Sequence, residues 1–104
     1  MSIFAAMIDD LFGDPHLARD AIWRAGGSGS GVAVRIIRRQ PDRIGSFGEA
    51  RFWAATTVIE VRTAEVQLLV EGDSFEIAGE SFTVQGEPLR DGERLVWTAE
   101  VQPA

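Results

Sequence analysis

The second half of the chain is built from short runs of alternating apolar and polar residues, with turn-forming pairs between them. Residues 73–78 and 81–85 flank Gly79-Glu80, and residues 95–101 follow Asp91-Gly92. A period of two places alternate side chains on one face of a strand, so each run predicts a half-buried β-strand. Several such strands with turns between them predict a mainly β fold, a small antiparallel β-sandwich or barrel.

The run around Gly79 predicts one hairpin in detail. A two-residue type II′ turn with Gly79 first would pair Ile77 with Phe82 and Phe75 with Val84. All four side chains then lie on one face, so the turn chemistry and the hydrophobic phase agree.

The hairpin around Asp91-Gly92 can be predicted in the same way, from the length of its loop and the alternation of apolar residues. A three-residue loop would place Leu89 opposite Leu95. One face of the final strand is predicted to carry four apolar residues: Leu95, Trp97, Ala99 and Val101.

Further strands are predicted upstream. Residues 21–24 and 32–39 flank a glycine-rich run at 26–31, and 50–62 is the longest strand candidate, with a start that is apolar on both faces. A phosphate-binding loop would need a helix after the glycines, whereas a strand follows and the chain has no lysine, so we predict a hairpin loop. Residues 64–71 fit either a turn or a short strand.

Residues 3–12 have the apolar spacing of a short amphipathic helix, which Ser2 can cap and Gly13 can end. Three turns are not stable alone in water, so this helix must dock on something. We favour the core of its own domain, and a neighbouring subunit is the alternative. Residues 14–17 predict one further helical turn.

These elements predict a single domain over residues 1–104, with the helix at 1–13 and the barrel or sandwich at 20–104. No helix alternates with the strands, which argues against a parallel α/β sheet. The N-terminus lacks a basic stretch followed by an apolar segment, and no apolar run is long enough for a membrane span, so we expect neither a signal peptide nor a membrane protein.

The amino-acid composition excludes most kinds of catalytic site. The chain has no cysteine and one histidine, which excludes disulfides, thiolate metal sites, cysteine nucleophiles and multi-histidine metal centres. His16 lies in the predicted turn without a recognisable catalytic partner, and no pair of carboxylates is marked out as acid and base. We therefore predict a protein that is not an enzyme, with no cofactor and no metal.

The charges are unevenly distributed along the chain. Residues 19–51 carry seven arginines against three acids, a net charge of +4, and residues 52–104 carry three arginines against ten acids, a net charge of −7. The total of −6 makes non-specific duplex binding unfavourable. Two oppositely charged segments suit head-to-tail contact between identical copies, unless the charges intermingle in space.

The densest basic patch lies on and after the 32–39 strand, with Arg35, Arg38, Arg39 and Arg43. Either these arginines form a solvated outer face or they contact an acidic protein or a nucleic-acid backbone. We take them as interface candidates, together with Ile44 and Phe47 of the turn-rich 40–50 connection. A small nucleic-acid-binding β-barrel is the alternative function of a different class.

The order of these features resembles a known family. After the N-terminal helix comes Asp-Pro-His-Leu-Ala-Arg-Asp-Ala-Ile-Trp-Arg at 14–24, then Glu-Gly-Asp-Ser-Phe-Glu-Ile-Ala-Gly-Glu-Ser-Phe-Thr-Val-Gln-Gly at 71–86, then Pro88, Asp91 and Leu-Val-Trp at 95–97. This order is similar to that of the head–tail joining proteins of lambda-like tailed phages, also called head-completion or stopper proteins. It is most similar to their relatives in proteobacterial prophages and gene transfer agents.

The resemblance implies a structural part of a virion or gene-transfer-agent particle, assembled in the bacterial cytoplasm. Such proteins are small β-barrels that form a hexameric ring beneath the portal and adaptor at the head–tail junction. They bind the tail terminator, help retain DNA, and let it pass through the lumen without sequence recognition. By position, the 40–50 loop would take part in ring contacts. A tail terminator or minor tail protein is the alternative within phage biology. Charge reversal at Arg38 and Arg39 is expected to stop joining while the monomer stays folded.

Overall fold

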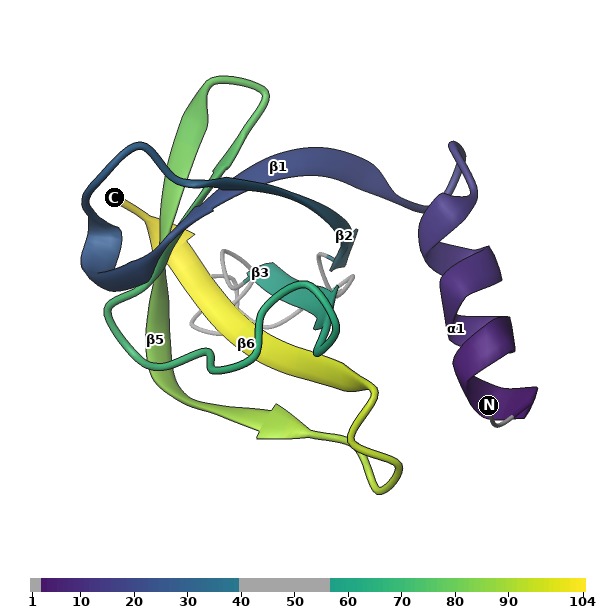
Figure 1. Ribbon diagram of the computed structural model, residues 1–104. Helices are drawn as coiled ribbons and strands as arrows, with labels where there is room; N and C mark the ends of the chain where they lie inside the picture. Colours follow the sequence, from purple (N-terminus) through teal and green to yellow (C-terminus); the bar gives the residue numbers. More distant parts are fainter. Residues whose placement is uncertain (1–2, 40–56) are drawn as a thin grey trace, which may run out of the picture.

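In the computed structural model, which describes residues 3–39 and 57–104, six antiparallel strands close into a barrel in the order β1-β2-β3-β6-β5-β4, with β4 pairing back to β1 (Figure 1). The strands are β1 (Arg19–Arg24), β2 (Val32–Arg39), β3 (Thr57–Arg62), β4 (Ser74–Ile77), β5 (Glu80–Arg90) and β6 (Val96–Pro103). The predicted mainly β fold with a short N-terminal helix is therefore confirmed, and the sheet closes as a barrel.

The barrel interior follows from the two-residue alternation of the strands. Val34 and Ile36 of β2 and Ile59 and Val61 of β3 are fully or almost fully buried, while the residues between them are partly exposed. On β6 the predicted face is buried at Trp97, Ala99 and Val101. The 63–73 connection forms no strand, and it adds Val66 and Leu69 to this core.

The glycine-rich run is the predicted hairpin loop between β1 and β2. Those strands pair antiparallel, and the loop opens with a single 3-10 turn, Ala25–Gly27. Upstream, the predicted turn at 14–17 is also present: the Asp14 carbonyl accepts from the Leu17 and Ala18 backbone N–H groups, and the Asp14 carboxylate accepts from the His16 N–H at 2.8 Å.

The β4–β5 hairpin has a different turn from the predicted one. Ile77 pairs with Glu80 and Phe75 with Phe82, so the turn is Ala78-Gly79 and not Gly79-Glu80. Ala78 and Gly79 have φ values of 52° and 84°, and two successive positive φ angles are those of a type I′ turn, whose twist suits a hairpin. The predicted type II′ register is wrong because Ala78 adopts the left-handed conformation.

That error does not change which side chains are buried. The observed partner of Ile77 is displaced by two residues from the predicted one, and a shift of two restores the same face. Phe75, Ile77, Phe82 and Val84 are all buried, as the alternation predicts.

The predicted pairing of Leu89 with Leu95 is also wrong. Leu89 pairs with Thr98, and the register of β5 against β6 is irregular between Gln85 and Leu89. Gly86, with a φ of 72°, lies inside this irregularity, which has the character of a β-bulge. As a result Leu89 is 69% exposed.

Asp91 organises the turn between β5 and β6. Its Oδ1 accepts the backbone N–H groups of Leu95 at 2.7 Å and Val96 at 3.1 Å. Slight desolvation raises the pKa of this carboxyl, but the backbone N–H donors, Val96 first, outweigh it and lower the pKa below 3.8. The charged form is therefore the one that stabilises the turn.

Asp91→Asn should lower the free energy of unfolding by about 1 kcal/mol at neutral pH, because an amide oxygen accepts these hydrogen bonds less strongly than a carboxylate. The folded pKa is depressed, so the stabilisation is present above pH 3.8 and is lost as the pH falls through the folded value. Urea unfolding of both proteins from pH 7 downward should show the difference disappearing. Glu93→Gln, which removes a charge from the same turn, is the control and should show no such convergence.

The helix α1 (Ile3–Gly13) ends at Gly13, as predicted, and lies beside the barrel (Figure 1). Of its side chains, Phe12 alone is buried, with the Arg62 guanidinium 5.4 Å from the ring centre. The Arg35 Nε donates to the Phe12 carbonyl at 3.1 Å, and Arg62 pairs with Asp9 at 3.2 Å. Docking on its own core, the alternative we favoured, therefore holds for Phe12 and not for the rest of the apolar face.

Candidate functional site

Arg35, the first of the predicted interface arginines, is used within the chain. It lies on the outer face of β2, where its Nη1 pairs with Asp20 at 2.9 Å and its Nη2 donates to the Ala18 carbonyl at 3.3 Å. With its bond to the Phe12 carbonyl, this guanidinium ties α1, the following turn and β1 to the barrel.

Arg38 and Arg39 face opposite sides of the same strand. Arg38 continues the inward phase of Val34 and Ile36, and its guanidinium carbon lies 4.9 Å from the centre of the Phe82 ring. Its buried Nε has no hydrogen-bond partner among the described residues. Arg39 points outward, with a side chain 63% exposed that pairs with Glu60 at 2.6 Å. Of the three predicted arginines on the described part of β2, Arg39 is thus the most accessible to a partner.

The other predicted interface residues, Arg43, Ile44 and Phe47, lie outside the described residues, as does the 40–50 connection that carries them. The structure therefore places Arg35, Arg38 and Arg39 on one strand, and the predicted interface itself stays a prediction.

Opposite charges from the two halves of the chain meet inside the molecule. Arg24 pairs with Glu76 at 2.9 Å, and Arg39 with Glu60, so basic residues of the 19–51 segment are neutralised by acids of the 52–104 segment. At these positions the charges intermingle, which was the alternative to two oppositely charged faces. Head-to-tail contact must therefore be argued from other surfaces.

One such surface is an exposed apolar face of α1. We call it the α1 stripe, and it consists of Ile3, Phe4, Met7 and Leu11, which are between 43% and 71% exposed. Their spacing of three and four residues puts all four on one side of the helix. The opposite side, with Phe12, faces the barrel.

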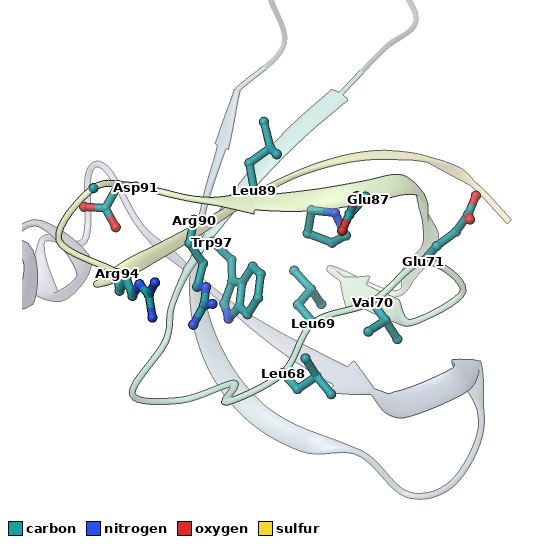
Figure 2. Close-up of a pocket in the computed structure, with 12 residues that line it drawn as sticks. Leu68, Leu69, Val70, Glu71, Glu87, Leu89, Arg90, Asp91, Arg94 and Trp97 are labelled. Atoms are coloured by element: carbon teal, nitrogen blue, oxygen red, sulfur yellow. The ribbon is translucent and has the colours of Figure 1, made fainter.

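A second surface is an open hollow of about 870 Å³ between the 63–73 connection and the β5–β6 hairpin (Figure 2). We call it the Trp97 hollow, and its apolar lining includes Leu68, Leu69, Val70, Pro88 and Trp97. The Trp97 indole donates to the Val66 carbonyl at 2.8 Å, which fixes the ring in the wall.

The ends of the Trp97 hollow differ in charge. Arg90 and Arg94 lie toward one end together with the turn carboxylate Asp91, and Glu71 and Glu87 lie toward the other (Figure 2). The Arg90 guanidinium carbon is 4.9 Å from the centre of the Trp97 ring, a distance at which a cation is attracted to the ring face.

Sequence reasoning did not identify this hollow. The sequence pattern predicts that Leu89 pairs with Leu95, and it fits residues 64–71 to either a turn or a short strand. The available signal was the apolar run at 68–70, which lacks a clean strand alternation and so cannot bury every side chain in one sheet.

Within residues 3–39 and 57–104, no group of three histidine, cysteine or carboxylate side chains is placed to hold a metal ion. His16 is exposed in its turn. No helix in the described part of the chain is long and apolar enough to cross a membrane.

A small closed β-barrel with an exposed apolar helix and an open apolar hollow has surfaces suited to contacts with other chains. The family model of the Phage Head-Tail Attachment protein matches residues 1–101, and the chain belongs to this family. No curated protein matches the sequence. The family is structural rather than enzymatic, and it assigns the chain to the head–tail junction of the virion, in contact with other head or tail proteins.

Proposed function

We propose that the chain is the head-completion or stopper protein of its particle. In this role several copies form a ring around the DNA channel, hexameric by family resemblance, between the portal or adaptor of the head and the tail terminator. The ring helps retain packaged DNA and lets it pass during ejection. The family match over residues 1–101 is the observation that carries this proposal.

The surfaces of the barrel support a ring. A ring of identical copies needs two different, complementary faces on each copy. The α1 stripe and the Trp97 hollow are two such faces, both apolar and both open to solvent. The chain acts as one domain, with the helix at 1–13 and the barrel at 20–104.

The charge of the chain supports passage of DNA rather than binding to it. With a net charge of −6, a channel wall of this protein would repel phosphates, because non-specific affinity for DNA comes from cation density. Two of the arginines that could supply that density, Arg24 and Arg39, are paired with acids of the same chain. The alternative of a free nucleic-acid-binding barrel is therefore disfavoured.

Particles assembled without this chain should be full heads that carry no tails and lose their DNA. Electron microscopy of lysates from the deletion strain checks this, with the gene restored in trans as the control. If the heads instead carry tails of abnormal length, the chain is a tail terminator. If the tails are normal, it has no part in joining.

A further inference from the structure

The α1 stripe lacks a partner within the described chain. A helix of 11 residues is about 16 Å long, and helices of this length are not stable in water without packing. Its own barrel covers Phe12, whereas Phe4 and Met7 remain 53% and 55% exposed. The helix therefore presents an apolar face to some other surface.

The Trp97 hollow, like the α1 stripe, is an apolar surface that is open to solvent. Leu68 is 65% exposed at its rim, and Trp97 forms part of its wall, whereas the exposed Leu89 points to the other side of β5 (Figure 2). An amphipathic helix that lays its apolar face into such a groove is a common mode of recognition, with apolar anchors every three or four residues along one side of the helix. Ile3, Met7 and Leu11 have this spacing.

The charges fix how the helix would lie. On a helical projection Asp10 flanks the α1 stripe, whereas Asp9 faces away from it and pairs with Arg62. Asp10 forms no ion pair within the described residues, and neither do Arg90 and Arg94 at one end of the hollow. Near the C-terminus of α1, Asp10 would meet these arginines. The positive N-terminal end of the helix dipole would then lie toward Glu71 and Glu87.

From these observations we infer that the α1 stripe of one copy docks in the Trp97 hollow of the next copy, head to tail, with Asp10 against Arg90 and Arg94. The inference rests on the proposed ring and identifies its contact. A contact of this kind is heterologous, so it leaves a free stripe at one end and a free hollow at the other until the ring closes.

The contact is small. Four partly exposed side chains supply much less than the roughly 800 Å² per partner of a standard stable interface. Free copies should therefore associate weakly, and the contact should become stable when a platform holds several copies in a ring. A test must trap a transient contact.

Disulfide trapping suits this chain, because it has no cysteine of its own. A mixture of the M7C and L68C proteins, oxidised together, should give about ten times more cross-linked dimer than a mixture of M7C and S81C. Ser81 is an exposed matched control on the β4–β5 hairpin. Equal yields in the two mixtures would overturn the inference.

The single and double variants separate the other possible occupants. The M7C/L68C double variant should form a ladder of multimers, because each copy carries both halves of the contact. A monomer with an internal disulfide would mean that the helix returns to its own barrel. A dominant M7C homodimer would mean that two helices pair symmetrically. Either result contradicts the inference.

A charge exchange tests the orientation. D10R on the M7C protein should lower the cross-linked yield several-fold, and R94D on the L68C protein should restore it. No loss with D10R would contradict the assigned orientation.

If no specific cross-link forms while the chain still joins heads to tails, the inference fails and the proposed function stands. If the cross-links form but particles lacking the chain still carry tails, the proposed function fails instead.

Discussion

Asp73→Ala is expected to lower the free energy of unfolding by about 3 to 5 kcal/mol, because the substitution removes a buried carboxylate that accepts from three partly buried N–H donors. The Asp73 carboxylate is almost fully buried. It accepts from the Trp23 indole at 3.1 Å, the Gly26 N–H at 2.8 Å and the Val70 N–H at 3.1 Å. It thus joins β1, the glycine loop and the 63–73 connection, and it holds the segment that forms one side of the Trp97 hollow.

Urea unfolding followed by tryptophan fluorescence measures this change. Asp73→Asn should fall between the two proteins, because its amide keeps one acceptor oxygen and loses the other. Asp20→Ala, which removes a side chain 90% exposed, should cost less than about 1 kcal/mol. A loss for Asp73→Ala no larger than that of Asp20→Ala would show that the carboxylate does not hold these segments together.

Arg39 is predicted to contact an acidic neighbour in the particle, so Arg39→Glu would replace attraction with repulsion. The yield of joined particles should then fall about tenfold or more. The assay adds the purified variant to tailless heads and free tails. The sequence alone predicts this loss for charge reversal at Arg38 and Arg39 together. Because Arg38 lies over the Phe82 ring on the inward face, a glutamate there would put a charge against the core and destabilise the barrel. The test is therefore confined to Arg39.

Two variants separate the contact from general effects of charge. Arg19→Glu makes the same change of charge at an exposed position on β1 and should join normally. Arg39→Gln should give an intermediate loss, because it removes attraction without adding repulsion. Each variant is first shown by urea unfolding to be folded, since Arg39→Glu also places a like charge opposite Glu60. Normal joining by Arg39→Glu would remove Arg39 from the interface.

The alternation of apolar residues was enough to predict the buried face of the β4–β5 hairpin. It identified Phe75, Ile77, Phe82 and Val84 as one face even though the turn between them was placed one residue late. Burial depends on the parity of the register, whereas the turn depends on whether Ala78 adopts a positive φ. Ala78 carries no local signal that distinguishes these conformations.

Closure of the barrel could not be predicted, because it depends on pairs that are distant in sequence. Trp23 of β1 pairs with Phe75 of β4, and no turn sets that register. Without this pairing the same strands fit a sandwich equally well, so both architectures remained open at the level of sequence.

The docking surfaces, too, could be predicted from the sequence only in part. Helical spacing predicts the apolar face of α1 and its need for a partner. The barrel leaves this face exposed because Phe12 is the side chain that packs against it, and this could not be predicted from spacing. The neutralisation of Arg39 by Glu60 and the bulge that exposes Leu89 both depend on strand register. Sequence patterns therefore predicted candidate surfaces, and strand pairing decided which of them are free.

The most direct measurement is the fraction of tailed particles, counted by electron microscopy. The wild-type protein is added to tailless heads purified from the deletion strain and mixed with free tails. If the chain joins heads to tails by docking, tails should attach when it is added and should be absent when it is left out. Tails that attach without it, or heads that stay tailless in its presence, would contradict the account.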